Sequence, residues 1–162
     1  MLVDQGGYVA SYKTILVGTD GSESSFRAVE RAAAVAADTD ATLLIVSAYT
    51  EMSDRDRERA SSALGEEAYK VVGSHPADDI LRDAADRAKK VGANSVDTFC
   101  KAGDPVDVLV QAIDERKADL CVVGNRGLNS LAGRLLGSVP ANISHRAACD
   151  VLIVHTTTGR AR

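Results

Sequence analysis

The sequence predicts an α/β fold: a doubly wound, five-stranded parallel sheet in the order 3-2-1-4-5, with helices on both faces. Five short runs are predicted as strands; four are rich in Val, Ile and Leu and lack strict alternation, as expected of strands buried on both faces, and the third alternates. Four helical patterns separate these runs, and strands that alternate with helices favour a parallel sheet. The length of 162 residues suits one domain with a sizeable core.

The first strand and helix are predicted between Lys13 and Asp38. The run at 13–19 ends in a turn at 18–22, where Ser22 is a favourable N-cap for the helix that follows. Helical spacing places four apolar residues on one face of this helix: Phe26, Val29, Ala33 and Ala36.

A second buried strand is predicted at 41–49. The charge-dense segment 51–73 indicates a solvated loop or a mobile helix, with a lid over a ligand as the alternative. An amphipathic helix follows at 76–91, with Ser74 as N-cap and Gly92 as C-cap. Its apolar stripe comprises Ile80, Leu81, Ala84, Ala88 and Val91.

The third strand, 95–101, alternates polar and apolar residues, which is typical of an edge position. Asp104 and Pro105 form a favourable N-cap and first-turn pair for a helix that ends at about Lys117. Four residues of this helix are expected to face inward: Val106, Leu109, Val110 and Ile113.

The fourth strand, 118–123, leads into a glycine-punctuated loop. Ser138 is the predicted N-cap of the last helix, at 139–148, with Pro140 in its first turn. The fifth strand is predicted at 150–155.

The composition excludes several classes of protein. Hydrophobic residues make up 45% and charged residues 26% of the chain, as in ordinary globular proteins, and the net charge of −4 argues against a nucleic-acid binder. No apolar run reaches the length of a membrane span, and the first residues lack a signal-peptide pattern. The three widely spaced cysteines read as small hydrophobic residues in a reducing compartment, not as metal ligands. We therefore expect a cytoplasmic protein with neither nucleic acid nor membrane as partner.

A single domain is expected over residues 12–156. It is flanked by a flexible N-terminal extension, 1–11, and by a polar tail, 157–162, neither of which shows periodicity.

The glycine-punctuated loop carries the main functional signal. It reads Gly124-Asn125-Arg126-Gly127, nine further residues, then Gly137-Ser138. A strand, a glycine loop and a helix start together suit an anion, because free N–H groups and the helix dipole favour negative charge there. The alternative is a glycine-rich connection that merely turns the chain.

The predicted strand order supports the first interpretation. In an open parallel sheet, ligands bind at the carboxyl ends of the strands where the order reverses, here between strands 1 and 4. The loops at 18–22 and 124–127 follow those two strands. Ala48, at the end of strand 2, and the turn at Gly103 are expected to flank the site.

The pattern G-x-x-G, nine residues, G-S resembles that of nucleotide-binding universal stress proteins. The resemblance runs from Tyr12 to Val154. It implies that Asp20 lies near the base and ribose of a nucleotide and that Gly137 and Ser138 hold phosphate. The expected nucleotide-binding residues are Gly18, Thr19, Asp20, Ala48, Gly103, Val123, Gly124, Asn125, Arg126, Gly127, Gly137, Ser138 and Val139.

The identity of the nucleotide stays open between cyclic AMP (cAMP) and ATP. No Walker A lysine is present, and the cationic side chains near the loops are Arg126 and Arg134. Two arginines and backbone amides suit the single phosphate charge of cAMP better than the several charges of ATP. The text GRLLGSVPANIS also resembles an actinobacterial branch of the family that favours cAMP. We rank cAMP at least equal to ATP; with ATP, Mg²⁺ would bind too, and Asp20 is its candidate ligand.

The sequence favours a binding protein, a sensor or buffer of adenine nucleotides, over an enzyme. His75, His145 and His155 are far apart, and no catalytic motif is present. The alternative is a slow ATPase or phosphotransferase that uses Mg·ATP. A response-regulator-like phosphoacceptor would need an acidic pair after the first strand, where this chain has Asp20 alone. A flavin carrier would need aromatic residues around the flavin, and this chain has few.

The fifth strand predicts a partner. In the order 3-2-1-4-5 the apolar strand 150–155 lies at an edge of the sheet, and exposed edges of this kind invite pairing. We expect a homodimer in which this strand meets its mate across a two-fold axis; the resemblance implies the same. The alternative is an edge covered by the polar C-terminal tail.

Overall fold

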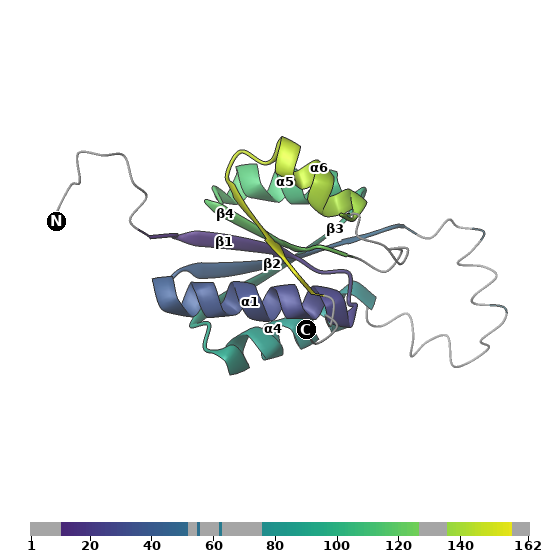
Figure 1. Ribbon diagram of the computed structural model, residues 1–162. Helices are drawn as coiled ribbons and strands as arrows, with labels where there is room; N and C mark the ends of the chain where they lie inside the picture. Colours follow the sequence, from purple (N-terminus) through teal and green to yellow (C-terminus); the bar gives the residue numbers. More distant parts are fainter. Residues whose placement is uncertain (1–10, 52–54, 56–61, 63–75, 127–135, 157–162) are drawn as a thin grey trace, which may run out of the picture.

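The structure, a computed structural model, describes residues 11–51, 55, 62, 76–126 and 136–156. Within them, five strands form one parallel sheet in the order β3-β2-β1-β4-β5, which confirms the predicted fold (Figure 1). β1 is central and pairs with β2 on one side and β4 on the other. The strands are β1 (Thr14–Gly18), β2 (Thr42–Tyr49), β3 (Ser95–Ala102), β4 (Leu120–Gly124) and β5 (Asp150–Val154).

Helices cover both faces of the sheet (Figure 1). α1 (Glu23–Thr39) and α4 (Pro76–Val91) pack on one face, and α5 (Pro105–Arg116) and α6 (Ser138–Arg146) pack on the other. The apolar core is accordingly split by the sheet, because successive strand residues point to opposite faces. In β1, Ile15 and Val17 join the core beneath α1, whereas Leu16 joins the core beneath α5.

Two predicted capping residues begin their helices as expected. The Ser22 side chain accepts the N–H of Ser25 at the start of α1. The Asp104 carboxylate accepts the N–H groups of Val106 at 2.9 Å and Asp107 at 3.2 Å at the start of α5. Each cap satisfies donors that a helix start leaves without partners.

The bounds of these elements differ from the predicted ones by at most two residues. One side chain of the predicted core is placed wrongly, because Val91 is 42% exposed. Burial along α4 ends at Ala88; the chain then turns at Gly92 and buries Ala93 instead. Ser74, His75 and most of the segment 51–73 lie outside the described residues.

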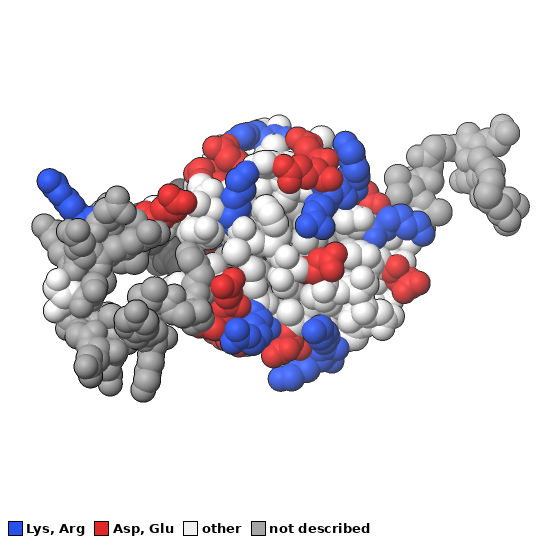
Figure 2. Space-filling model, turned by 180° about the vertical axis from the view of Figure 1, so that it is seen from behind, with Lys and Arg blue, Asp and Glu red and all other residues white. Residues whose placement is uncertain are grey.

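Charges of both signs are interspersed on the face seen from behind in Figure 2. Exposed ion pairs among the described residues join Arg82 to Asp79 at 3.0 Å and Arg146 to Asp107 at 2.8 Å. In the described ranges, we find no helix with both the length and the apolar character needed to cross a bilayer.

Candidate functional site

The loops after β1 and β4 meet at the carboxyl edge of the sheet. β1 and β4 are parallel neighbours, so the chain leaves both strands on the same side. Ser24, in the first turn of α1, donates its hydroxyl to the backbone oxygen of Arg126 over 3.2 Å. The loop after β4 is therefore bonded to the first turn of the helix that follows the loop after β1.

Thr19 shapes the loop after β1 from inside. Its side chain is buried, and its hydroxyl lies 2.8 Å from the hydroxyl of Ser25. The N–H of Gly21 donates to the same hydroxyl at 3.2 Å, and the N–H of Thr19 donates to the Val46 carbonyl at 2.9 Å. The Thr19 side chain thus holds the loop in place from inside the protein.

Asp20 is oriented by the residue that caps α1. Its Oδ1 atom accepts the N–H of Ser22 at 3.0 Å and the Ser22 hydroxyl at 2.6 Å, which forms an Asx turn. The next residue, Gly21, has a φ of 81°, and a Cβ there would lie 2.8 Å from the Ile80 side chain. This turn requires glycine, and it presents the Asp20 carboxylate at the carboxyl edge.

Asn125, the first residue after β4, bonds to several other elements. Its N–H donates to the Val154 carbonyl at the end of β5, and its own carbonyl accepts the N–H of Gly137 at 3.0 Å. Its side-chain oxygen accepts both the N–H of Thr156 at 2.9 Å and the Thr156 hydroxyl at 2.8 Å. Asn125 therefore joins the β4 loop to β5 and to the start of α6.

The glycines of the loop are needed for contacts within the protein. A Cβ on Gly124 would lie 3.3 Å from the Thr156 methyl carbon, and a Cβ on Gly137 would lie 3.3 Å from the Asn125 carbonyl oxygen. These separations are shorter than ordinary van der Waals contacts, so glycine at both positions lets the loop segments pack together. This packing is a second reason for glycine, in addition to the expected close approach of a phosphate.

The start of α6 corrects one prediction. Gly137, with an extended backbone, is the N-cap, and Ser138 is already the first helical residue, so Ser138 does not cap the helix. No side chain bonds to the start of α6 within the described residues, whereas Ser22 and Asp104 cap α1 and α5. The α6 start thus keeps uncapped amides beside the glycine loop, and the Ser138 hydroxyl is not spent on the helix.

Three flanking residues lie where the strand order predicts. Ala48 is next to last in β2 and partly buried, and Gly103 turns the chain after β3 with its N–H on the Tyr49 carbonyl at 2.9 Å. Gly18 ends β1, and a Cβ there would lie 3.2 Å from the Leu109 side chain. All three are at the carboxyl edge, with Gly103 farthest from the β1–β4 junction because β2 lies between.

The remaining predicted site residues differ in role. Val123 is buried in the core beneath α5, and Val139 packs against the same core, so both side chains belong to the packing of the domain. The Arg126 carbonyl accepts the Ser24 bond described above. Gly127 and Arg134 lie outside the described residues.

Sequence reasoning missed Ser24, Arg27 and Thr156. Thr156 follows the fifth strand predicted at 150–155, yet it is 2% exposed, and Arg27 donates to its carbonyl at 2.6 Å. In the structure Gly124 pairs with Val154, so residues just after β5 lie beside the loop after β4. No local pattern in the sequence marks this placement.

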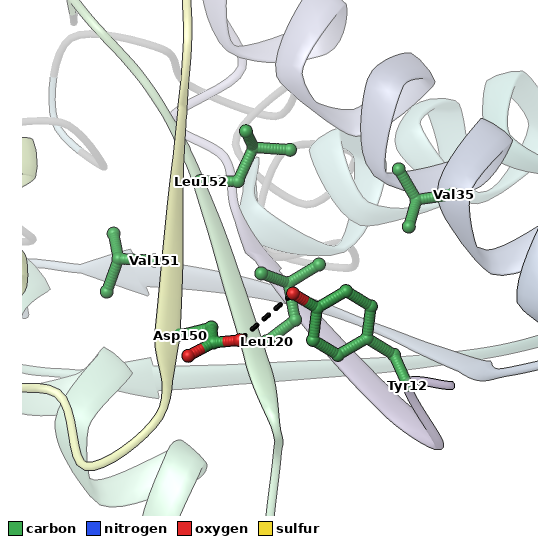
Figure 3. Close-up of a pocket in the computed structure, with 6 residues that line it drawn as sticks. All are labelled: Tyr12, Val35, Leu120, Asp150, Val151 and Leu152. Atoms are coloured by element: carbon green, nitrogen blue, oxygen red, sulfur yellow. Dashed lines mark hydrogen bonds between the residues drawn. The ribbon is translucent and has the colours of Figure 1, made fainter. Parts of the chain in front are cut away.

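A cavity of about 360 Å³ lies at the opposite, amino end of the strands (Figure 3). The side chains of Tyr12 and Asp150 point toward one another there, and the Tyr12 hydroxyl donates to the Asp150 carboxylate at 3.0 Å. This bond raises the pKa of the Tyr12 phenol. The other lining residues are Val35, Leu120, Val151 and Leu152. The cavity is therefore separate from the glycine loops and lies beside β5.

No group of three His, Cys, Asp or Glu side chains among the described residues is arranged to hold a metal ion. His155 lies at the site, with its Nδ1 atom 3.3 Å from the side-chain nitrogen of Asn125, whereas His145 is exposed on α6.

Comparison with known proteins gives one consistent result. Residues 11–155 match the model of the Universal stress protein family. A universal stress protein of Mycobacterium tuberculosis is 56% identical over 149 residues, which cover 92% of this chain and 100% of the relative. A putative universal stress protein of Staphylococcus aureus is 32% identical over 147 residues, 90% of this chain and 86% of the relative. A crystal structure of a universal stress protein in complex with cAMP is 47% identical, with a TM-score of 0.68, and covers 91% of this chain and 100% of that one.

Proposed function

The chain belongs to the universal stress protein family, and from this premise we propose that it binds an adenine nucleotide, cAMP or ATP, at the loops after β1 and β4. The observation that carries the proposal is the uncapped start of α6 joined to the glycine loop. The free N–H groups there form the positive end of the helix dipole, so a phosphate would supply the missing cap. The protein would act as a sensor or buffer of the nucleotide.

The phosphate is assigned to the start of α6 at Gly137, Ser138 and Val139. The Gly137 N–H already donates to the Asn125 carbonyl, so the donors proposed for the phosphate are the backbone amides of Ser138 and Val139 and the Ser138 hydroxyl, which the helix does not use. Gly124 to Arg126 lie directly against this start through the bond between Asn125 and Gly137.

The base and ribose are assigned to the β1 side of the site. Asp20 presents a carboxylate oriented by its Asx turn, a suitable acceptor for ribose hydroxyls or for base N–H groups. Ala48, near the end of β2, and Gly103, just after β3, are small residues, and the flat ring of the base is proposed to lie beside them.

Charge supports cAMP as a ligand at least equal to ATP. cAMP carries a single negative charge, which backbone amides and one arginine can balance, whereas ATP calls for more cations or Mg²⁺. In the described part of the loop, Arg126 is the cationic side chain. The cAMP complex of a relative 47% identical to this chain points the same way.

Isothermal titration of nucleotide-free protein with cAMP and with Mg·ATP, side by side, tests this proposal. We expect saturable binding of about one cAMP per chain, at least as tight as Mg·ATP, with cyclic GMP as the matched control for the base. Tighter binding of Mg·ATP would reverse the ranking, and no binding of either nucleotide would contradict the proposal.

A binding role is favoured over catalysis. Among the described residues, no group of three His, Cys, Asp or Glu side chains could hold a metal ion. A steady-state assay with Mg·ATP discriminates the two roles, because a sensor or buffer forms no product. Product formation that Gly124→Ala abolishes would favour the slow ATPase instead.

We also assign a homodimer to β5. The Val154 carbonyl bonds to the loop after β4, so its backbone groups face β4. Successive residues of a parallel strand alternate sides, so the backbone groups of Val151 and Ile153 face away from β4. A second copy of β5 across a two-fold axis would pair with them. The cavity beside Val151 and Leu152 adds apolar surface next to this edge (Figure 3).

A further inference from the structure

We infer that Thr156 and Ser24 are positioning residues of the nucleotide site, which fix the loop after β4 relative to the start of α1. The inference rests on the proposed nucleotide binding and goes beyond the glycine motif, which includes neither residue. Thr156 follows β5 and is 2% exposed, although it is a polar residue near the end of the chain. Its burial is explained by the bonds that it makes.

The Thr156 bonds all lead to the site. Its N–H and its hydroxyl converge on the side-chain oxygen of Asn125, at 2.9 and 2.8 Å. Its hydroxyl also contacts the Ser24 hydroxyl, and its carbonyl accepts from Arg27 of α1 at 2.6 Å. Thr156 is thus clamped between α1 and Asn125.

Ser24 closes the network from the other side. Its hydroxyl lies against the Thr156 hydroxyl and 3.2 Å from the Arg126 carbonyl. Because Thr156 donates its one hydroxyl proton to Asn125, the single Ser24 proton serves one of these two oxygens at a time. Two residues of the glycine loop, Asn125 and Arg126, are therefore tied to the first two turns of α1, the helix whose cap orients Asp20. The expected phosphate and ribose sides of the site are held in one fixed relation.

The effect extends to the phosphate side through Asn125. Its carbonyl accepts the N–H of Gly137, the N-cap of α6. A change in the position of Asn125 moves the residue that precedes the amides assigned to phosphate. Positioning to within fractions of an ångström matters for such donors, because hydrogen bonds weaken steeply with poor geometry.

Gly124 is explained by the same network. A Cβ at this position would lie 3.3 Å from the Thr156 methyl carbon and 3.6 Å from its hydroxyl oxygen. The first glycine of the motif therefore makes room for Thr156. Direct contact with a ligand is not its sole requirement.

The test compares three variants by titration with cAMP. Thr156→Val keeps the shape of the side chain but removes the hydroxyl, and it should weaken cAMP binding by about tenfold, the effect of one lost hydrogen bond on a preorganised site. Thr156→Ser keeps the hydroxyl and should restore affinity to within about twofold of the wild type. Thr98→Val, at an exposed position of β3, is the matched control and should bind as the wild type does.

The outcomes separate the two proposals. A wild-type protein that binds neither cAMP nor Mg·ATP contradicts the proposed function and the inference with it. Wild-type binding with unchanged affinity in Thr156→Val overturns the inference alone. If Thr156→Val does not fold, Ser24→Ala replaces it: weaker binding by about threefold supports the network, and unchanged binding overturns it.

Discussion

The backbone oxygen of Asn125 accepts the N–H of Gly137 over 3.0 Å, which joins the two ends of the glycine motif. The first end follows β4 and the second begins α6. A strand end and a helix start thus form one unit at the carboxyl edge, next to the turn that carries Asp20.

Gly124→Ala should weaken cAMP binding by about tenfold, because its Cβ presses on the Thr156 methyl group and displaces the loop. The fold should remain intact. The double variant Gly124→Ala with Thr156→Ser removes that methyl group and should recover most of the lost affinity. Titration calorimetry of both variants is the check; no recovery would place the effect of the added Cβ elsewhere than at Thr156.

Ser138→Ala should separate binding from stability. Because Ser138 does not cap α6, its loss should change the free energy of unfolding by no more than about 0.5 kcal/mol. Affinity for cAMP should still fall by about fivefold, because the hydroxyl is assigned to the phosphate. Urea denaturation and titration of one preparation measure both; a destabilised variant with normal affinity would reverse the assignment.

Val151→Pro should convert a dimer into a monomer. Proline removes an outward-facing N–H of β5 and leaves the bonds to β4 in place, which edge strands tolerate. Light scattering should report a mass near 17.0 kDa for this variant and twice that for the wild type. Val151→Ala loses the same packing but keeps its N–H, so it should remain a dimer.

A Val151→Pro variant with the wild-type mass would exclude β5 pairing. A monomeric wild-type protein would do the same.

Cys121 should make stability fall at alkaline pH. Burial is the main cause that raises the pKa of its thiol to about 12, from 9.0 in an exposed thiol. The unfolded thiol therefore loses its proton first as pH rises above 9, which favours unfolding up to the folded pKa. Between pH 7 and 10.5 this costs about 2 kcal/mol, at about 1.4 kcal/mol per pH unit above 9.

Urea denaturation across this pH range, with Cys121→Ala as the reference, measures that cost. The variant should be less stable than the wild type at pH 7, because it leaves a cavity, and the gap should shrink as pH rises. A constant gap would mean that Cys121 ionises equally in both states. Alkylation provides a second check, because native Cys121 should resist labelling at pH 8.

Local signals predicted most of this fold. Ser22 and Asp104 are strong caps, and the short apolar runs alternate with helical patterns, so the order of the elements along the chain followed. The strand order 3-2-1-4-5 was expected from the doubly wound fold class and not from a local signal. Val91 was wrongly predicted to be buried, because helical periodicity does not tell where a neighbouring element stops covering the apolar face of a helix. Val91 is the last residue of α4 and is exposed.

The site was predictable in its backbone and less so in its side chains. The glycine spacing located the loops, but Gly137 replaced Ser138 as the cap because the extended backbone, more than the capping side chain, sets where α6 begins. Thr156 was missed because its burial depends on partners 31 and more positions away, Asn125 and Ser24. Long-range polar contacts of this kind have no local pattern.

Binding of a nucleotide at the carboxyl edge is best tested by ¹H–¹⁵N NMR titration of the full chain with cAMP. We expect shifts of the amides of Gly18 to Asp20, Gly124 to Arg126 and Gly137 to Ser138. Amides around Tyr12 and Leu120, at the opposite end of the sheet, should stay in place. Shifts confined to the cavity between Tyr12 and Asp150, or none with either cAMP or Mg·ATP, would contradict it.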